Sequence, residues 1–422
     1  MKEYDLPVGW KYVSLADIAN VINGVSFKPN DIKKEGIRIL RSGNIQSGYL
    51  VLKDDDVFLD NTYYNRDNTL QYLDNCITAS TGSIDVLGKC GTVFEEIHNC
   101  QIGAFMRLVR SKSKDDALYI SFILHSPLYY QYIRRLSKNG TSINNINNSH
   151  LEEFKFPLPP KNVKEEISKW YYSLEKKIAI NTRMNAELEA MAKQLYDYWF
   201  VQFDFPDENG KPYKYSGGKM VYNPTLKREI PAGWENKTLG EISKTPKESI
   251  APFDTPNKIF KHYSIPAYDI YGSYSLDRGD EIQSSKFVVH NGQILAPKLN
   301  PWYNRIIMVN SDENAICSTE YVILEPKEDY VRGFIFYTVK TDGFITFCSK
   351  GSTGTSHSQR RVPPEILRGF SFPFNADVVS DFTKCVMSQI NILNRNLEQN
   401  RQLSILRDSL LPMLMNGQVT VE

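Results

Sequence analysis

Two segments of the sequence place cationic side chains beside a loop rich in glycine, serine and threonine. In one, two arginines and a lysine lead into the loop Asn139–Ser142; in the other, a lysine precedes the loop Gly351–Ser356 and two arginines follow it. Backbone N–H groups and hydroxyls of such loops can donate hydrogen bonds to phosphate oxygens, and the cations supply the opposite charge. The DNA-contacting residues expected here are Arg134, Arg135, Lys138, Asn139, Thr141, Lys350, Ser352, Thr353, Arg360 and Arg361.

Three other polar loops, Arg41–Asn44, Thr81–Lys89 and Lys298–Arg305, extend this set. Arginine can pair with guanine and asparagine with adenine through two hydrogen bonds to the base edge. Taken alone, each loop is more often an ordinary solvated surface, and aromatic residues more often serve core packing than base stacking. The residues added to the expected DNA contacts are Arg41, Ser42, Asn44, Thr81, Ser83, Lys89, Lys298, Asn300, Trp302 and Arg305.

The sequence offers weak support for catalysis. Asn300–Tyr303 differs by one residue from the NPPY loop of amino-methyltransferases, but neither Gly88–Gly91 nor Gly351–Gly354 has the pattern that cradles S-adenosylmethionine. The second of these is not a P-loop, because no Lys-Ser/Thr pair follows its last glycine. The histidines and cysteines show no zinc-binding spacing. We therefore expect no catalytic residue, no metal site and no cofactor bound by this chain.

Length and composition describe an ordinary globular protein. The chain has 422 residues, 41% of them hydrophobic, and 50 basic against 49 acidic side chains give a net charge of +1. This balance excludes proteins that bind nucleic acid through bulk positive charge, such as histones. No apolar run approaches the ~20 residues needed to cross a bilayer, and the first residues lack the pattern of a secretory signal. We expect a cytoplasmic protein with reduced cysteines.

The elements that must position these loops occur twice. Pro7–Trp10 returns as Pro231–Trp234, and further collinear matches at a nearly constant spacing run to the end of the chain. The loop sequences in the middle of each half do not match. Two copies of one scaffold therefore present different loops, which suggests two recognition events of one kind with different targets.

Each copy begins with a segment that reads as an α+β domain rich in sheet. The apolar runs Ile37–Leu40 and Tyr321–Leu324, and less firmly Val93–Phe94, predict strands. Leu118–Leu136 predicts a helix interrupted at Pro127.

Each copy ends in a long amphipathic helix. Val163–Phe200 contains no proline or glycine, and its heptad spacing predicts two apolar rows. The second row, three residues after the first, would contain Trp170, Met184, Met191 and Tyr198. We expect the two helices to pair through buried Asn181 and Asn396, whose amides would bond and fix the register; alternatively, each helix packs only on its own domain. The pairing residues expected are Ile167, Leu174, Asn181, Leu188, Leu195, Phe382, Gln389, Asn396, Leu403 and Leu410.

The chain as a whole resembles the specificity subunit of type I restriction–modification enzymes. The Pro-x-Gly-Trp opening of each half carries this resemblance, together with the exit Phe156–Pro159, the connector Phe203–Trp234 and the closing Leu410–Gly417. Phe372–Phe374 departs from the pattern because it lacks the second proline of the first exit.

The resemblance implies an α+β fold with two duplicated target-recognition domains, separated by two long helices in an antiparallel coiled coil with a pseudo-twofold arrangement. It implies domains at residues 1–159, 160–202, 203–229, 230–375, 376–416 and 417–422: first recognition domain, first helix, connector, second recognition domain, second helix and tail. The implied partners are double-stranded DNA, two modification subunits that bind S-adenosylmethionine, and restriction (motor) subunits that use ATP and Mg²⁺. An adenine methyltransferase with fused recognition domains, and a coiled-coil scaffold that never touches DNA, stay open as alternatives.

Overall fold

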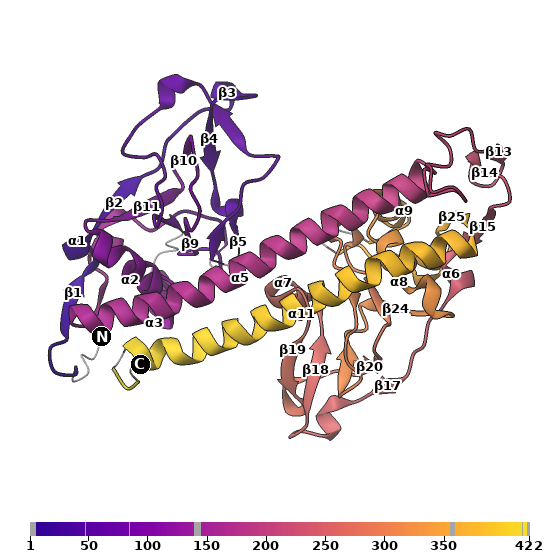
Figure 1. Ribbon diagram of the computed structural model, residues 1–422. Helices are drawn as coiled ribbons and strands as arrows, with labels where there is room; N and C mark the ends of the chain where they lie inside the picture. The colour runs from indigo at the N-terminus through magenta and orange to yellow at the C-terminus, as the bar shows by residue number, and fades with distance from the viewer. Residues whose placement is uncertain are drawn as a thin grey trace. The chain divides into compact units, whose positions relative to one another are not determined.

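The structure is a computed structural model that describes residues 6–46, 48–83, 85–138, 145–354, 359–415 and 417–419, with only the backbone of Ser137 and Lys138. Asn139, Thr141 and the side chain of Lys138, all expected at the DNA surface, lie outside the described residues. The chain forms two compact units, residues 1–179 with 402–422 and residues 180–401. The boundary between them falls inside both long helices, α5 (Lys161–Tyr196) and α11 (Ala376–Met415) (Figure 1).

The first unit contains a head, defined as residues 6–159, in which short strands alternate with short helices. Its helices are α1 (Leu15–Ile18), α2 (Lys114–Leu124), α3 (Pro127–Lys138) and α4 (Asn148–Glu152), with 3₁₀ turns η1 (Pro29–Asp31), η2 (Ser42–Asn44) and η3 (Asn61–Tyr63). Its strands are β1 (Lys11–Ser14), β2 (Ala19–Asn23), β3 (Ile32–Lys33), β4 (Ile37–Leu40), β5 (Ile45–Gln46), β6 (Tyr49–Leu50), β7 (Val57–Leu59), β8 (Asn75–Thr78), β9 (Cys90–Thr92), β10 (Cys100–Ile102), β11 (Met106–Ser111) and β12 (Lys155–Leu158).

The strands of the first head form sheets of order β2-β11-β8-β9-β6-β5 and β10-β4-β7-β3, and β1 pairs with β12. Every residue of β8 is buried, as expected for a central strand covered on both faces. α2 is apolar around most of its circumference and is buried, whereas α3 is amphipathic. The helix predicted around Pro127 is indeed interrupted there, because α3 starts at Pro127, a residue suited to the first turn of a helix. The strand predicted at Val93–Phe94 is wrong, since β9 ends at Thr92.

The second unit contains a second head, defined as residues 230–375, and the connector before it. Its helices are α6 (Leu239–Ile242), α7 (Ile265–Tyr271), α8 (Arg332–Thr338), α9 (Asp342–Lys350) and α10 (Pro364–Arg368), with 3₁₀ turns η5 (Pro252–Asp254), η6 (Gly279–Glu281), η7 (Pro301–Tyr303) and η8 (Asp329–Val331). Its strands are β13 (Met220–Asn223), β14 (Arg228–Pro231), β15 (Glu235–Thr238), β16 (Ser243–Lys244), β17 (Ser249–Ile250), β18 (Ile259–Tyr263), β19 (Ser275–Arg278), β20 (Lys286–Val288), β21 (Ile294–Pro297), β22 (Ile307–Met308), β23 (Ala315–Cys317), β24 (Tyr321–Pro326) and β25 (Ser371–Phe374).

The two heads share one backbone frame, which confirms the duplication. The Pro-x-Gly-Trp turns coincide: Trp10 N donates to Pro7 O and Trp234 N to Pro231 O, both at 3.1 Å. In both turns the glycine has a positive φ (84° and 82°), which glycine adopts with least strain. β1 pairs antiparallel with β12 as β15 does with β25, and β4 pairs parallel with β10 as β18 does with β23. The missing second proline of Phe372–Phe374 therefore leaves the strand pairing unchanged.

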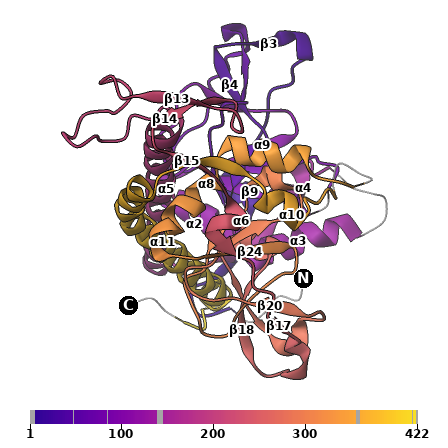
Figure 2. The same ribbon diagram turned by 90° about the vertical axis from the view of Figure 1, so that its right-hand side faces the viewer.

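The connector packs against the start of the second head. α5 ends in a π-helical turn, η4 (Asp197–Val201), after which Phe203 and Phe205 both contact the Trp234 ring, at centroid distances of 5.6 and 5.1 Å. The Phe205 ring also stacks on Tyr213 at 4.8 Å. The hairpin β13–β14 follows in the chain. Within the second head, α9 lies beside α10 (Figure 2). The connector is therefore packed through its aromatic side chains, as its composition indicated.

The long helices carry the predicted first row of contacts but not the predicted second row. Ile167, Leu174 and Asn181 on α5 are buried, and so are Phe382 and Asn396 on α11; Leu188, Leu195, Gln389, Leu403 and Leu410 are partly buried. The second row is wrong, because Met184 and Met191 are 42% and 58% exposed. The buried second row lies four residues after the first, at Tyr171, Ile178, Asn185, Ala192 and Trp199. No helix in the described part of the chain is long and apolar enough to span a membrane.

Candidate nucleic-acid interface

Two of the loops singled out by the sequence, 81–89 and 298–305, follow matching parts of the two frames. In the first head Ile146 N donates to Ala79 O at 2.6 Å, and in the second Val362 N donates to Lys298 O at 3.0 Å. Next to these bonds, isolated bridges pair Ser80 with Asn145 and Leu299 with Arg361. We define the first loop surface as residues 41–44, 53, 81–89 and 134–135, and the second as residues 298–305, 350–354 and 359–361. Each surface thus starts from the same main-chain pairing and carries different side chains.

The second loop surface brings its predicted residues together. Asn300 N donates to Arg360 O at 2.8 Å, and Arg360 N donates to Asn300 Oδ1 at 3.1 Å. Thr353 and Arg361 exchange both main-chain bonds, at 2.9 and 2.8 Å. Asn300 has a φ of 48°, a left-handed conformation that asparagine tolerates well. Asn300 is buried and its side chain supports the loop, so it is not free to read a base.

The arginines of the second loop surface already have partners. Arg305 forms two bonds to the Asp269 carboxylate, at 2.6 and 2.8 Å, and lies over the Tyr303 ring. Arg361 Nε bonds both carboxylate oxygens of Glu320, at 3.0 and 3.1 Å. The Arg360 guanidinium donates to the carbonyl of Ser352 at 2.7 Å. These cations are held by internal acceptors, so a phosphate would have to replace an existing bond.

The other residues of the second loop surface differ in exposure. Lys350 and Tyr303 are exposed, whereas Trp302 and Lys298 are half-buried. Ser352 is buried, and its hydroxyl donates to Ser349 O at 2.7 Å. Trp302 packs beside Tyr303, with ring centroids 6.0 Å apart. The exposed part of this surface is therefore aromatic as well as basic.

The first loop surface is held by one buried network. Asn44, 2% exposed, accepts from Arg41 N at 2.8 Å and donates to Asp56 Oδ1 at 2.6 Å. The Asp56 carboxylate also accepts from Lys53 N at 2.8 Å, so it ties two loops together. Like Asn300, Asn44 is used inside the fold. Arg41 is exposed and bonds only weakly, donating to Asp55 O at 3.3 Å, while Ser42 is partly exposed.

The cations of the first loop surface are not neutralised. Arg134 and Arg135 are exposed on α3, and neither they nor Lys53 and Lys89 make an ion pair or a side-chain hydrogen bond within the described residues. Lys89 is half-buried; burial, and next the charge of Lys53, lower the pKa of its ammonium group. Thr81 accepts from Ser83 N at 3.3 Å, and Ser83 is exposed.

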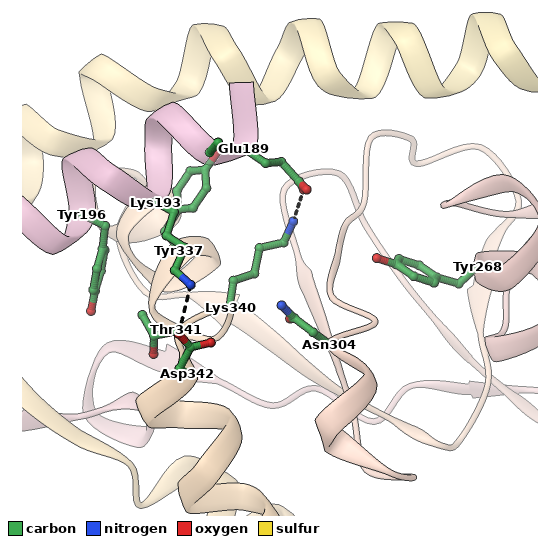
Figure 3. A pocket seen from close by; sticks show the side chains of 10 residues that line it. Glu189, Lys193, Tyr196, Tyr268, Asn304, Tyr337, Lys340, Thr341 and Asp342 are labelled. Carbon is green, nitrogen blue, oxygen red and sulfur yellow. Dashed lines mark hydrogen bonds and ion pairs between the residues drawn. The ribbon is translucent and has the colours of Figure 1, made fainter. Parts of the chain in front are cut away.

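A cavity of about 350 Å³ lies next to the second loop surface, between α5 and the second head (Figure 3). Its carboxylates both carry lysine partners: Lys340 bonds Glu189, and Lys193 bonds Asp342 at 3.0 Å. Asn304, which follows η7, lines the cavity, so both the loop 298–305 and α5 contribute residues to its lining. The charges of its lining therefore cancel in pairs.

Comparison with known proteins identifies a domain in the first part of the chain. Residues 7–190 match the sequence model described as "Type I restriction modification DNA specificity domain". This segment of the chain is therefore similar to the type I restriction–modification specificity family.

Two curated relatives match the chain over most of its length. It is 24% identical over 330 residues to the type I restriction enzyme MjaIX specificity subunit of Methanocaldococcus jannaschii, covering 72% of this chain and 69% of the relative. It is 29% identical over 394 residues to the StySPI specificity subunit of Salmonella potsdam, covering 88% and 80%. A solved type I S subunit from M. genitalium covers 98% of each chain with a TM-score of 0.53 at 14% identity, which shows a shared fold.

The helix pair α5–α11 carries a polar layer inside the second unit. Asn181 Nδ2 donates to Asn400 Oδ1 at 2.9 Å, and Asn396 Nδ2 donates to Asn185 Oδ1 at 2.9 Å. The prediction that Asn181 and Asn396 bond each other is therefore wrong. Because the partner's number falls as the α5 number rises, α5 and α11 are antiparallel here. The second bond repeats the first with the two helices exchanged.

Sequence reasoning missed Lys53 of the first loop surface and Asp56, which supports it. Lys53 precedes Asp54–Asp56, so in the sequence it looks neutralised by its neighbours. In the structure Asp56 is buried, and its carboxylate contacts the Lys53 backbone, not its ammonium group. The described residues contain no group of three or more His, Cys, Asp or Glu placed to hold a metal ion.

Proposed function

We propose that this chain reads a bipartite DNA target, with each head reading one half-site. The observation that carries the proposal is the pair of loop surfaces, which share main-chain bonds but differ in side chains. A conserved frame with divergent loops is what two readings of different sequences require. The names of the specificity subunits that this chain resembles support the same role.

The two heads would hold DNA by different contacts. Phosphate contacts position a protein on the duplex, and base contacts give it specificity. Exposed Arg134 and Arg135 suit phosphates in the first head. Lys350, Tyr303 and the partly exposed Trp302 are the accessible groups of the second. The paired helices set the distance between the half-sites.

We further propose that catalysis belongs to partner subunits. α5 presents Ile180, Met184 and Met191, all at least 42% exposed, on its outer side. Exposed apolar side chains at helical spacing suit a protein partner. Two modification subunits that bind S-adenosylmethionine would dock on the helices and connector, and restriction subunits using ATP and Mg²⁺ would join them. This chain would bind none of these cofactors.

Methylation of genomic DNA tests the proposal. The chain is expressed with its modification subunits in a host without adenine methylation, and methylated adenines are mapped by single-molecule sequencing. We expect one two-part motif, and replacing residues 1–159 with those of a relative should change only one half of it. If both halves changed together, or if the isolated chain bound labelled S-adenosylmethionine stoichiometrically, the proposal would be overturned.

A further inference from the structure

Each head is bonded to a long helix by a tyrosine that follows a glycine with left-handed backbone. Tyr49 comes directly after Gly48, which has a φ of 87°. Tyr274 comes two residues after Gly272, which has a φ of 67°. Both tyrosines follow, in the chain, the equivalent strands β4 and β18 of the shared frame. They therefore hold matching places in the duplicated heads.

The first tyrosine joins three elements within the first unit. The Tyr49 hydroxyl bonds the Glu175 carboxylate on α5 and lies 2.8 Å from the Glu175 main-chain oxygen. Arg407 on α11 bonds the other carboxylate oxygen at 2.9 Å. The Glu175 side chain is only 3% exposed, so water competes little for these bonds. Burial, and next the Glu175 charge, raise the pKa of Tyr49, so its hydroxyl keeps the proton that it donates.

The second tyrosine makes the corresponding bond within the second unit. The Tyr274 hydroxyl donates to Glu398 Oε2 on α11 at 2.8 Å. Arg401 bonds both oxygens of the same carboxylate, at 2.7 and 3.0 Å, and lies over the Tyr274 ring. A Cβ on Gly272 would stand 3.0 Å from the Leu397 side chain, so the chain comes close to α11 here. Burial, and next the bond to Glu398, raise the pKa of Tyr274 to about 12.

Each bond adds a second point of attachment to a head that apolar contacts already hold. Tyr171 packs into the core of the first head, and Glu175 lies about one turn further along α5. Ile390 packs into the core of the second head, and Glu398 lies about two turns further along α11. Apolar contacts have no preferred direction, whereas a charge-assisted hydrogen bond fixes a distance and an angle. The second point therefore stops each head from turning against its helix.

We propose that Tyr49 and Tyr274 are positioning residues for DNA recognition, each of which locks its head onto the long helices and so fixes the gap between half-sites that the protein accepts. This role rests on the proposed function, because a gap has meaning only if each head reads a half-site. Base reading belongs to the loops, so loss of either hydroxyl should relax the gap and leave the bases read unchanged. The effect should be larger for Tyr49, because its bond depends on both helices.

The test compares Tyr49→Phe, Tyr274→Phe and the double variant with two controls, Tyr64→Phe and Tyr330→Phe, which change exposed tyrosines of the same two heads. Phenylalanine keeps the ring and removes only the hydroxyl. Each full chain, assembled with its modification subunits, is titrated with duplexes that carry both half-sites. The half-sites stand at the native gap, as mapped by methylation, or at a gap one base pair shorter or longer.

The quantity compared is the gap preference, the ratio of the dissociation constants at the altered and native gaps. The unaltered complex and both controls should prefer the native gap equally. We expect Tyr49→Phe and Tyr274→Phe each to lower the preference about three- to tenfold, and the double variant to lower it further. The preference for cognate over substituted bases at the native gap should stay the same in every variant.

Weaker binding or a lower Tm with an unchanged gap preference would show that the two tyrosines only stabilise their heads, and would overturn their positioning role. Equal relaxation in Tyr64→Phe and Tyr330→Phe would overturn it as well. An unaltered complex without any sequence preference would defeat the proposed function, and the positioning role with it. An unaltered complex that reads both half-sites at one gap, which no variant relaxes, would overturn the positioning role alone.

Discussion

The two heads share a frame and carry opposite arrangements of charge on it. In the first, Arg134 and Arg135 are exposed on α3 and form no ion pair with a carboxylate among the described residues. In the second, Arg305 and Arg361 are held by Asp269 and Glu320. The first head has 17 basic and 16 acidic side chains, and the second has 16 of each. The difference therefore lies in pairing, and net charge alone says little about how such a surface meets DNA.

This difference predicts two kinds of binding. Unpaired cations release counterions when they meet phosphates, so the first head should contribute most of the salt dependence. Cations held by carboxylates must exchange one acceptor for another, which gives less net energy and more dependence on geometry. The second head should thus contribute more to discrimination than to attraction.

The largest effect concerns the helix pair, where the two halves are alike. Asn396→Leu leaves the buried Asn185 carbonyl without its donor, and Asn181→Leu removes a donor from the partly buried Asn400 carbonyl. We expect Asn396→Leu to cost about 1 to 3 kcal/mol in the free energy of unfolding, measured with urea, because an unsatisfied buried amide keeps its desolvation penalty. Asn181→Leu should cost no more than this, because water can reach Asn400. Similar losses from both variants would show that the layer is shared equally.

A double-mutant cycle identifies the partners in this layer. Asn185→Leu with Asn396→Leu removes both members of one bond, so their effects should be less than additive. Asn181 and Asn396 bond different partners, so Asn181→Leu with Asn396→Leu should cost nearly the sum of the single losses. Stronger coupling in the second combination would contradict the observed pairing.

The next effect compares the arginine pairs of the two heads in DNA binding. Arg134→Gln with Arg135→Gln should weaken binding by the full complex about tenfold and reduce the salt dependence by about 1.8, for two lost phosphate contacts. Arg360→Gln with Arg361→Gln should reduce the salt dependence less, because both guanidinium groups already have internal acceptors. Affinity titrations at several salt concentrations measure both. Equal salt dependences for the two double variants would contradict the expected difference between the heads.

The sequence predicted the frame well because its signals are local. The Pro-x-Gly-Trp turns, the helix start at Pro127 and the heptads of α5 each depend on a few neighbouring residues. The second helix row failed because positions three and four residues on are both neighbours on a helix, and only the partner selects between them. Met184 and Asn185 show this, since the first is exposed and the second buried.

The candidate site was predictable as a set of loops but not as a set of free side chains. Asn44 bonds Asp56, Arg305 bonds Asp269 and Arg361 bonds Glu320, each across an interval that no spacing rule covers. Tertiary pairing thus removed both asparagines from the candidate base readers and neutralised two arginines. Lys53, which is followed in the sequence by three aspartates, has no ion-pair partner among the residues that the structure describes.

The next prediction is a smaller loss of stability, and it concerns an ion pair of the second head. Arg305 is only 15% exposed, and Asp269→Ala leaves its guanidinium partly buried without the carboxylate. We expect a loss of about 1 to 2 kcal/mol in the stability of the second unit, because half of the pair is solvated. Thermal unfolding with hydrogen exchange measures the loss. The exposed Asp254→Ala in η5 is the control, and an equal loss there would show that the pair does not matter.

The smallest predicted effect on stability comes from a variant that frees an arginine of the second head, as the arginines of the first head are free of carboxylate partners in the described structure. Glu320→Gln releases Arg361, which is half-exposed, so stability should change by less than about 0.5 kcal/mol. Affinity for DNA at low salt should rise about two- to threefold, and the salt dependence should steepen by up to about 0.9, as for one further phosphate contact. Glu328→Gln removes the same charge from an exposed position that holds no arginine in the described structure. Equal gains from both variants would mean that net charge, not the release of Arg361, governs attraction, and the contrast in pairing would lose its functional meaning.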